Sequence, residues 1–437
     1  MKIKLLKYLL CGYFTIIGNS LTYAKEPHES KDHKYSDSVY KNENAITLKG
    51  ATDLAIQFSP DLKSYKAGVG AARGSEKQAG YWENPELEIE VEDIGGTGQY
   101  SGSNSAQYTY SLSKSLDISG RRFARKGAAG EARKAATNAQ MVSRLNIIRN
   151  VHIAYAQVLS EAESVKLAKD QQNLAKQILK SVSRRVSAAR ESEIRRTKAT
   201  IAYETSMIEA SQKSQQLRSA KQKLAKLMGK EALDISLDHS HFFDLRAPRN
   251  INSYKEALNN SPVLKKSHHL RNEKKFSFKL EKAKKISNPT VKVGMREING
   301  INNGVNYNEQ AFVAGVSVAL PIFNWNYGNT TRAREELSQA RYNELQTKLS
   351  LEQNLIEEWK NWQVSYSTAK RLKKSIIPSA KKALRLARSG YKKGRLPYLE
   401  VLDAQRTLFE ARSRYYEALK QYHTARANIE FIAPSNS

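Results

Sequence analysis

The chain has 437 residues, and its 72 basic residues against 43 acidic residues give a formal net charge of +29. The basic residues are spread along helical stretches without a dense patch or a nucleic-acid-binding motif, so the charge indicates a solvated helical surface and no nucleic-acid partner. The one cysteine, Cys11, lies in an apolar N-terminal segment, so the rest of the chain forms no internal disulfide.

The first 24 residues have the parts of a secretory signal peptide. Three lysines precede a short apolar core from Leu9 to Ile17, and Thr22-Tyr23-Ala24 provides a cleavage site. Removing this segment would leave 69 basic and 43 acidic residues, a net charge of +26. No later stretch reaches the ~20 apolar residues of a membrane-spanning helix, so a membrane crossing would need a closed β-barrel.

Residues 25–44 are expected to form a flexible polar leader. Their low hydrophobicity and high charge favour a segment without a fixed structure or a metal site. Weak binding of a divalent cation remains an alternative, because four potential ligands lie close together: His28, Glu29, Asp32 and His33.

A first repeat is expected over residues 45–229. It begins with a helical stretch that has a turn at Ser59-Pro60. Two strands at about 85–94 and 106–116, joined by a Gly-rich loop, predict a β-hairpin. A long helical hairpin follows, with its tip near Arg190. In the first strand apolar residues alternate with four acidic ones, Glu86, Glu88, Glu90 and Glu92.

After a connection over residues 230–250, a second repeat is expected over residues 251–433. Its strands lie at about 289–298 and 310–320, with Lys292 and Arg296 on the polar side, and residues 298–308 form the loop. Its helical tip lies near Gly394. The interval from Arg190 to Gly394 is 204 residues, equal to the interval between the Asn-Pro pairs that open the two hairpins. Such a regular duplication means two copies of one unit.

The helices predict long, closely packed rods. Apolar residues in the last helix, from Val401 to Ile432, recur in steps of three and four, as in a coiled-coil seam. The first long helix, residues 120–190, would extend about 105 Å. Helices 191–229 and 251–286 are expected to stack end to end into a composite rod of about 112 Å.

These patterns predict a mostly α fold with a small β part, built from a duplicated unit of β-hairpin and long helical hairpin. Four strands cannot close a barrel alone, so their edges require other copies. A periplasmic coiled-coil scaffold or adaptor without a membrane barrel is the alternative, because a hairpin with one solvated face shows the same alternation. No histidine cluster has catalytic or metal-binding spacing, so neither an enzyme nor a cofactor is expected.

The ordered, duplicated motifs resemble those of the TolC family of outer-membrane efflux ducts. The motifs are Asn84-Pro85-Glu86-Leu87 before the first hairpin, Val318-Ala319-Leu320-Pro321-Ile322-Phe323 after the last strand, and the terminal block from Tyr391 to Gln405. Asn84-Pro85-Glu86-Leu87, together with the segment from Leu116 to Arg122, looks most like the heavy-metal branch of the cobalt–zinc–cadmium type.

The resemblance implies a homotrimer with a shared twelve-stranded barrel in the lipid of a Gram-negative outer membrane, continued by a periplasmic helical barrel. A periplasmic adaptor and an inner-membrane pump of the resistance-nodulation-division (RND) type would dock at the tips, near Arg190 and Gly394. The duct would be passive, with heavy-metal cations as one candidate cargo.

Two sets of site residues follow from this picture. The polar strand faces would line the barrel lumen with Glu86, Glu88, Glu90, Glu92, Lys292 and Arg296. The resemblance places the periplasmic aperture at Tyr391, Arg395, Glu400 and Asp403. In the first copy, Arg190 is expected where the family usually has a glycine.

Overall fold

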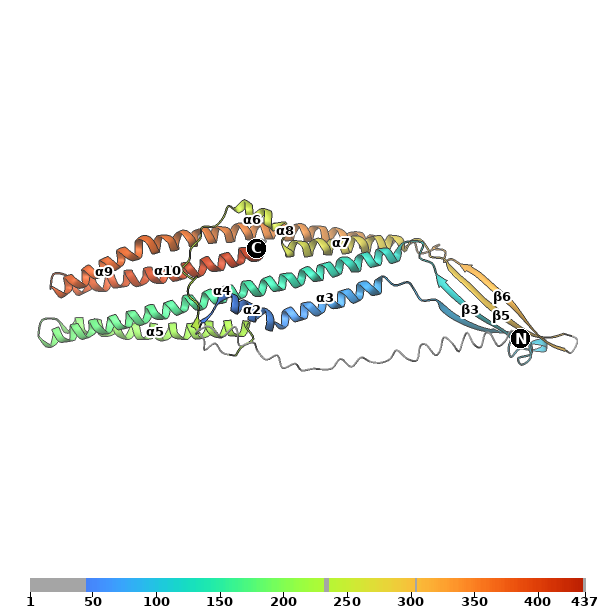
Figure 1. Ribbon diagram of the computed structural model, residues 1–437, viewed down its shortest axis with the longest axis horizontal. Coiled ribbons are helices and arrows are strands. Elements are labelled where there is room, and N and C mark those ends of the chain that lie inside the picture. The colour runs from blue at the N-terminus through green and yellow to red at the C-terminus, as the bar shows by residue number, and fades with distance from the viewer. Residues whose placement is uncertain (1–44, 232–235, 303–304, 435–437) are drawn as a thin grey trace. The chain divides into compact units, whose positions relative to one another are not determined.

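The computed structural model describes residues 45–231, 236–302 and 305–434. The expected signal peptide and leader lie outside these residues. Within them, the predicted mostly α fold with a small, duplicated β part is confirmed (Figure 1). A four-stranded sheet lies at one end of the helices, and two helical tips lie at the other end.

Long helices make up most of the described chain. Ser59 separates the first two, and its hydroxyl accepts a hydrogen bond from the backbone N–H of Leu62 (3.2 Å), which caps the second one. A short π-helix, Leu372–Ile376, interrupts the long helical segment that runs from Tyr327 to Lys392. The α-helices are α2 (Leu48–Phe58), α3 (Pro60–Ala79), α4 (Arg121–Ser187), α5 (Glu193–Leu227), α6 (Ile251–Leu258), α7 (Pro262–Ala283), α8 (Tyr327–Arg371), α9 (Ile377–Lys392) and α10 (Tyr398–Ile432).

The short helices do not stack as the sequence predicted. Helices α3 and α5 both pack on α4, while α7 and α10 both lie between α4 and α8. In Figure 1, α5 leads toward α2 and α3, and α10 ends near the beginning of α7. The predicted composite rod of residues 191–229 and 251–286 is therefore wrong. The long helix α4 is covered by α3 on its sheet-side half and by α5 on its tip-side half.

The strands form one antiparallel sheet in the order β2-β3-β5-β6. A separate pair of short parallel strands, β1 (Ala45–Ile46) and β4 (Ser236–Leu237), ties the beginning of the described chain to the connection between the repeats. The strands of the larger sheet are β2 (Glu86–Glu92), β3 (Gln107–Ser115), β5 (Thr290–Asn302) and β6 (Val305–Ser317).

The second hairpin is longer than predicted. Its ladder continues from Ile298, paired with Glu309, to Asn302, paired with Val305, so most of the expected loop at 298–308 is strand. Polar side chains on both strands hid this extension, and the Asn308 amide bonds the Asn299 side chain across the ladder at 2.8 Å. Strand β6 also ends at Ser317, three residues before the predicted end at 320.

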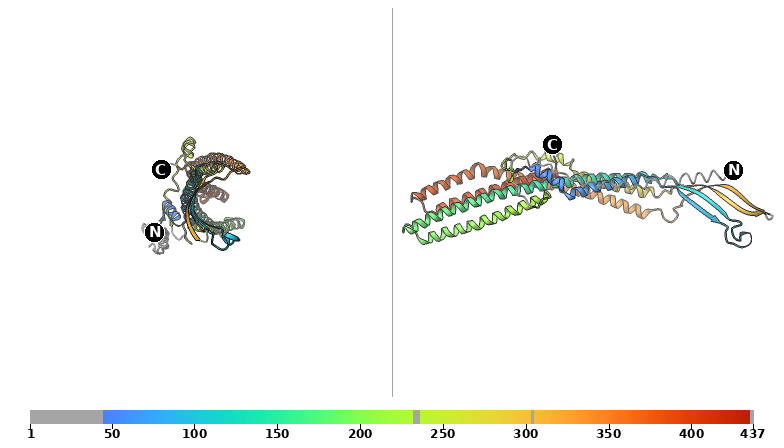
Figure 2. Two further views of the ribbon diagram at one scale, coloured as in Figure 1. Left: turned by 90° about the vertical axis from the view of Figure 1, so that its right-hand side faces the viewer. Right: turned by 60° about the horizontal axis from the view of Figure 1, so that its bottom comes forward.

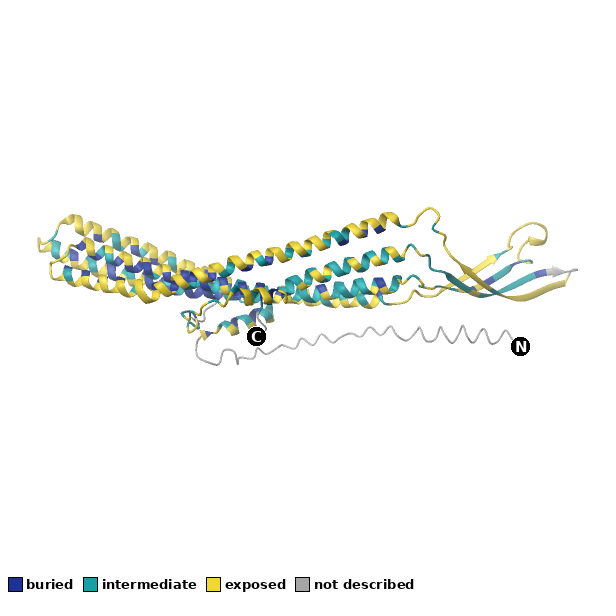
Figure 3. Ribbon diagram, turned by 90° about the horizontal axis from the view of Figure 1, so that it is seen from above, coloured by how far each residue is buried: buried dark blue, intermediate teal, exposed yellow. Residues whose placement is uncertain are grey.

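The core lies along the helices. Of the predicted α10 seam, Val401, Tyr415 and Tyr422 are buried and Ala404 is partly buried, which confirms that the seam faces neighbouring helices. Buried residues concentrate from the middle of the helices toward the tips, whereas the sheet is largely exposed (Figure 3). Seen end-on, the helices follow an open arc (Figure 2). In the single chain, the curved layer of helices and the sheet are therefore not covered by a further layer of structure.

Candidate channel lining and tip site

The register of the sheet sorts its side chains onto two faces. Glu90 pairs with Thr109, Thr109 with Arg296 and Arg296 with Ala311. One position along, the row is Ile89, Tyr110, Met295 and Phe312. Because neighbouring positions of a strand point to opposite faces, the candidate lumen residues share one polar face and the apolar residues share the other.

Ion pairs cross the polar face. The Lys292 Nζ lies 2.7 Å from a carboxylate oxygen of Glu88, and an Arg296 nitrogen lies 3.2 Å from Glu92. Arg296 also donates a hydrogen bond to the hydroxyl of Thr109 (3.0 Å), which is buried. The sequence did not identify Thr109 as a partner of Arg296, since the two residues are far apart in the chain.

Two of the four glutamates have no such partner. No ion pair or side-chain hydrogen bond joins Glu86 or Glu90 to another residue of the described chain. With Glu309 of β6, which lies in the row of Glu92, Gln107 and Ile298, the face carries five carboxylates and two cations, so its net charge is −3 in each chain. This leaves a negative surface that is only partly neutralised.

The apolar face is exposed in the single chain. Phe312 is 90% exposed and Val316 is 71% exposed. A contiguous apolar face of this kind marks a contact with lipid or another protein. Its other exposed large residues are Leu87, Ile89, Val91, Tyr110, Leu112 and Val293.

No helix in the described ranges is long and apolar enough to cross a membrane.

The two helical tips have the same backbone geometry, but the alignment differs from the predicted one. Gly394 has a φ of 70°, and the corresponding left-handed residue in the first tip is Ala189, with a φ of 55°. The N–H of the next residue then closes the turn, from Arg190 to the carbonyl of Arg185 and from Arg395 to the carbonyl of Gly390. The expectation that Arg190 replaces the usual glycine is therefore wrong. Ala189 occupies the position of the usual glycine, because the two repeats are offset by one residue at the tips.

Tyr391 is buried where the tips meet. The guanidinium carbon of Arg185, on α4, lies 4.4 Å from the centre of the Tyr391 ring, and an Arg185 nitrogen lies 3.4 Å from the Tyr391 carbonyl oxygen. The Tyr398 ring also packs against the Tyr391 ring, with ring centres 5.9 Å apart. Burial raises the pKa of the Tyr391 hydroxyl, and it raises the pKa of Tyr398 to about 12.

A carboxylate completes this tip cluster. Glu191, whose side chain is 6% exposed, forms ion pairs with Arg195 and, at 3.9 Å, with Arg185. The sequence prediction missed Arg185 and Glu191, because neither lies in the terminal motif that pointed to Tyr391. In the sequence, these two residues could be noticed only as charged residues beside the first tip.

The other predicted aperture residues lie apart from Tyr391. Arg395 and Glu400 are exposed, and no side-chain hydrogen bond or ion pair is found for either within the described residues. Asp403 is also exposed and lies 3.4 Å from Arg406, one turn further along α10. Within one chain, Tyr391 is therefore held by Arg185 and not by Arg395.

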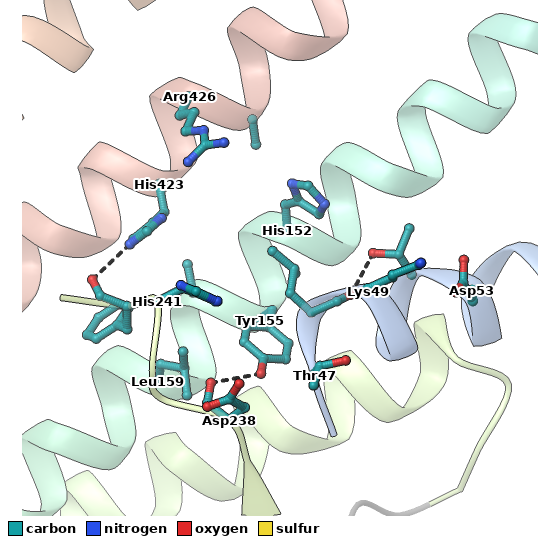
Figure 4. Close-up of a pocket in the computed structure, with 15 residues that line it drawn as sticks. Thr47, Lys49, Asp53, His152, Tyr155, Leu159, Asp238, His241, His423 and Arg426 are labelled. Atoms are coloured by element: carbon teal, nitrogen blue, oxygen red, sulfur yellow. Dashed lines mark hydrogen bonds between the residues drawn. The ribbon is translucent and has the colours of Figure 1, made fainter. Parts of the chain in front are cut away.

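A cavity of about 610 Å³ lies near the middle of the helices, between α2, α4, α10 and the connection between the repeats (Figure 4). Three imidazoles line it, those of His152, His241 and His423. The Tyr155 hydroxyl lies 2.8 Å from the carbonyl oxygen of Ile46 and 2.9 Å from that of Asp238, which fixes the wall formed by β1 and β4.

The imidazoles of this cavity do not form a metal centre. Across residues 45–231, 236–302 and 305–434, no group of three or more His, Cys, Asp or Glu side chains is arranged to hold a metal ion. His423 instead stacks on Phe242, and its Nε2 lies 3.0 Å from the Phe242 carbonyl oxygen.

Comparison with known proteins gives the same architecture. A family model described as "Outer membrane efflux protein" matches residues 51–230 and 253–433. The chain is 30% identical to the cobalt-zinc-cadmium resistance protein CzcC of Cupriavidus metallidurans, over 89% of this chain and 90% of that protein. It is 24% identical to the nickel-cobalt-cadmium resistance protein NccC of Alcaligenes xylosoxydans, over 66% of this chain and 63% of that protein.

Solved structures share the fold. The outer membrane protein VceC of Vibrio cholerae superposes with a TM-score of 0.70 at 16% identity, covering 88% of this chain and 95% of that one. The channel protein CusC gives a TM-score of 0.68 at 18% identity, covering 88% and 91%.

These findings exclude the alternative of a periplasmic scaffold without a membrane part. The matching proteins are outer-membrane channels with a large periplasmic portion, and the family is one of channels and not of enzymes. Such channels act as homotrimers with a periplasmic adaptor and an inner-membrane RND pump. Both matched segments together span most of the sequence. The chain belongs to the outer membrane efflux protein family.

Proposed function

We propose that three copies of the chain, after removal of residues 1–24 as a signal peptide, form a passive duct without catalytic activity for the export of transition-metal cations. The observation that carries the proposal is the two-faced sheet, which has an apolar face, a charged face and free outer edges on β2 and β6. Three such sheets joined edge to edge make a twelve-stranded barrel with lipid outside and charge inside.

The charge of the lumen supports a cationic cargo. A net charge of −3 on the polar face of each sheet becomes −9 in a trimer. A ring of carboxylates favours cations in a pore. The names of CzcC and NccC, which are resistance proteins for cobalt, cadmium and either zinc or nickel, point to the same class of solute.

The periplasmic end of the duct is formed by the two helical tips. Tyr391 and the cluster around it hold the tips of one chain together, and Glu400 and Asp403 would form acidic rings at the narrowest point. Residues near Arg190 and Gly394 lie at the extreme ends of the hairpins and are the surface offered to the adaptor. Opening then requires the tips of neighbouring chains to separate.

A pair of neighbouring substitutions tests the orientation of the sheet. Phe312→Asp places a charge on the apolar face, which destabilises a lipid-facing strand, although by less than the about 2–4 kcal/mol of an Arg or Lys near the bilayer midplane. We expect this variant to lose outer-membrane insertion and trimer formation. Val313→Asp, one residue along on the polar face, is the control and should assemble normally. Equal tolerance of both substitutions would contradict the barrel.

Metal export is tested by expressing the chain with its own adaptor and pump in a metal-sensitive strain. Growth in zinc, cobalt or cadmium should depend on the wild-type chain and on Val313→Asp, but not on Phe312→Asp. If resistance to organic solutes is restored and resistance to metals is not, the duct is retained and the metal cargo is rejected.

A further inference from the structure

Basic side chains gather where the sheet meets the helices. Lys114 is exposed on the apolar face of β3, in the alternating series that also presents Leu112, and it lies opposite Val291. Arg122 is near the beginning of α4, which β3 leads into, and Lys285 lies between α7 and β5. Strands β3 and β5 are the interior strands of the sheet. These cations are therefore away from the strand edges that neighbouring copies would cover.

Two of these cations stack on exposed aromatic rings. The guanidinium carbon of Arg122 lies 4.5 Å from the centre of the Trp82 ring, and the Lys285 Nζ lies 4.2 Å from the centre of the Tyr327 ring. Both rings are more than half exposed. Aromatic rings and long basic side chains suit the boundary between acyl chains and headgroups, because each has an apolar body and a polar end.

Nearby carboxylates leave the three cations unneutralised. Asp117 accepts hydrogen bonds from the backbone N–H groups of Arg121 and Arg122 and thereby caps α4. Glu281 pairs with Lys284 at 2.7 Å. No ion pair reaches Lys114, Arg122 or Lys285 from any acid in the described residues. Positive charge without an ion-pair partner thus lies on the apolar face, at Lys114, and at the junction of the sheet with the helices, at Arg122 and Lys285.

We propose that Lys114, Arg122 and Lys285, with the rings of Trp82 and Tyr327, bind the headgroups of anionic phospholipids in the leaflet of the outer membrane that faces the periplasm. This inference rests on the proposed function, since it requires the apolar face to contact lipid. A phospholipid fits better than a free anion, because the surface offers rings and an adjoining apolar face as well as charge. Each cation near an anionic surface adds about fivefold to the affinity.

The test uses the purified trimer in detergent, titrated with dansyl-phosphatidylglycerol and with dansyl-phosphatidylcholine, with energy transfer from tryptophan as the readout. The wild type should prefer the anionic lipid. The triple variant Lys114→Gln, Arg122→Gln, Lys285→Gln should bind it more than tenfold more weakly, with phosphatidylcholine binding unchanged. The double variant Lys114→Gln, Lys285→Gln spares the Arg122 bond to the Gly80 carbonyl and should show an intermediate loss.

A control variant removes three lysines from the beginning of α7 and the middle of α8, away from the sheet: Lys265→Gln, Lys266→Gln, Lys348→Gln. It should keep the lipid preference. Equal loss in this control, equal binding of both lipids by the wild type, or displacement of the anionic lipid by equimolar inorganic phosphate would each overturn the inference. Planar-bilayer conductance of every variant separates the two proposals. A conducting wild-type trimer without lipid preference rejects only this inference, whereas absence of trimer and conductance rejects the duct.

Discussion

The guanidinium of Arg185 lies over the ring of Tyr391, 4.4 Å from its centre, and this contact joins the tip of the first helical hairpin to that of the second. The Tyr391 hydroxyl is buried and has no hydrogen-bond partner in the described chain. The tyrosine therefore acts here through its ring, as the partner of a cation, and not through its hydroxyl.

Loss of this contact should loosen the tips. A cation over an aromatic face contributes about 0.5–2 kcal/mol, so Arg185→Ser should raise the open fraction of a closed duct several-fold. Tyr391→Ala should act similarly, whereas Tyr391→Phe keeps the ring and should change little. Single-channel conductance in planar bilayers measures the effect. Arg395→Ser is the matched control, and a larger response there would make Arg395 the partner of Tyr391 in the trimer.

The preference of the lumen for cations should weaken when a negative side chain is removed and strengthen when a positive one is removed. Glu90→Gln removes an unpaired carboxylate from each chain and should weaken the preference for cations. Lys292→Gln removes a cation and frees Glu88, so it should strengthen that preference. Reversal potentials in asymmetric salt report both changes. Shifts of the same sign in the two variants would place these residues outside the conduction path.

The sequence predicted the strands and helices of the duplicated fold because the patterns that define them are local. Alternation in the strands and the three–four spacing of the α10 seam each depend on neighbours within a few turns. The stacking of α3 with α5 and of α7 with α10 was missed, because helix lengths alone also allow residues 191–229 and 251–286 to form one rod. Which helix covers which half of α4 depends on long-range packing that no single segment encodes.

The tip site was only partly predictable for a similar reason. Tyr391 lies in a recognisable motif, but Arg185 lies 206 residues before it and becomes its neighbour only when the hairpins are side by side. The offset that places Ala189 opposite Gly394 was hidden because alanine rarely adopts a positive φ. A fixed repeat interval therefore identified the wrong residue, Arg190, at the first tip.

The residue with a positive φ is alanine in the first tip and glycine in the second. Exchanging the two residue types should therefore change the stability of the two tips in opposite directions. Ala189→Gly should stabilise the first tip by about 1 kcal/mol, since glycine adopts a positive φ without the steric cost of a Cβ. Gly394→Ala should destabilise the second tip by a similar amount. Hydrogen exchange of the tip amides measures both changes locally. Faster exchange in Ala189→Gly would mean that the added freedom of the unfolded chain outweighs the relieved strain.

The acidic rings at the aperture should bind blocking cations. Glu400 and Asp403 lie three residues apart on α10, hence on one face of the helix, and threefold symmetry would repeat each around the axis. Glu400→Ala with Asp403→Ala should abolish block by divalent or trivalent cations added on the periplasmic side. Glu410→Ala, further along α10, is the control. Unchanged block in the double variant would remove both residues from the aperture.

Stability should fall in mild acid because of the imidazoles in the central cavity. Burial lowers the pKa of His152 and His423 below the ordinary 6.5, and Arg426 acts in the same direction on both. Below pH 6.5 the unfolded chain therefore binds protons that the folded chain does not, so the free energy of unfolding decreases as the pH falls.

The carboxyl groups of Asp117, Glu131 and Glu281 have lowered pKa values, so they change the free energy of unfolding only near or below pH 4.5. Their effect on stability is therefore separated in pH from that of the imidazoles. Thermal unfolding followed by circular dichroism should show a lower Tm at pH 5.5 than at pH 7.5. In His152→Gln with His423→Gln this difference should shrink, because glutamine stays neutral over that range. An equally steep decrease in the double variant would assign the acid sensitivity to groups outside the cavity.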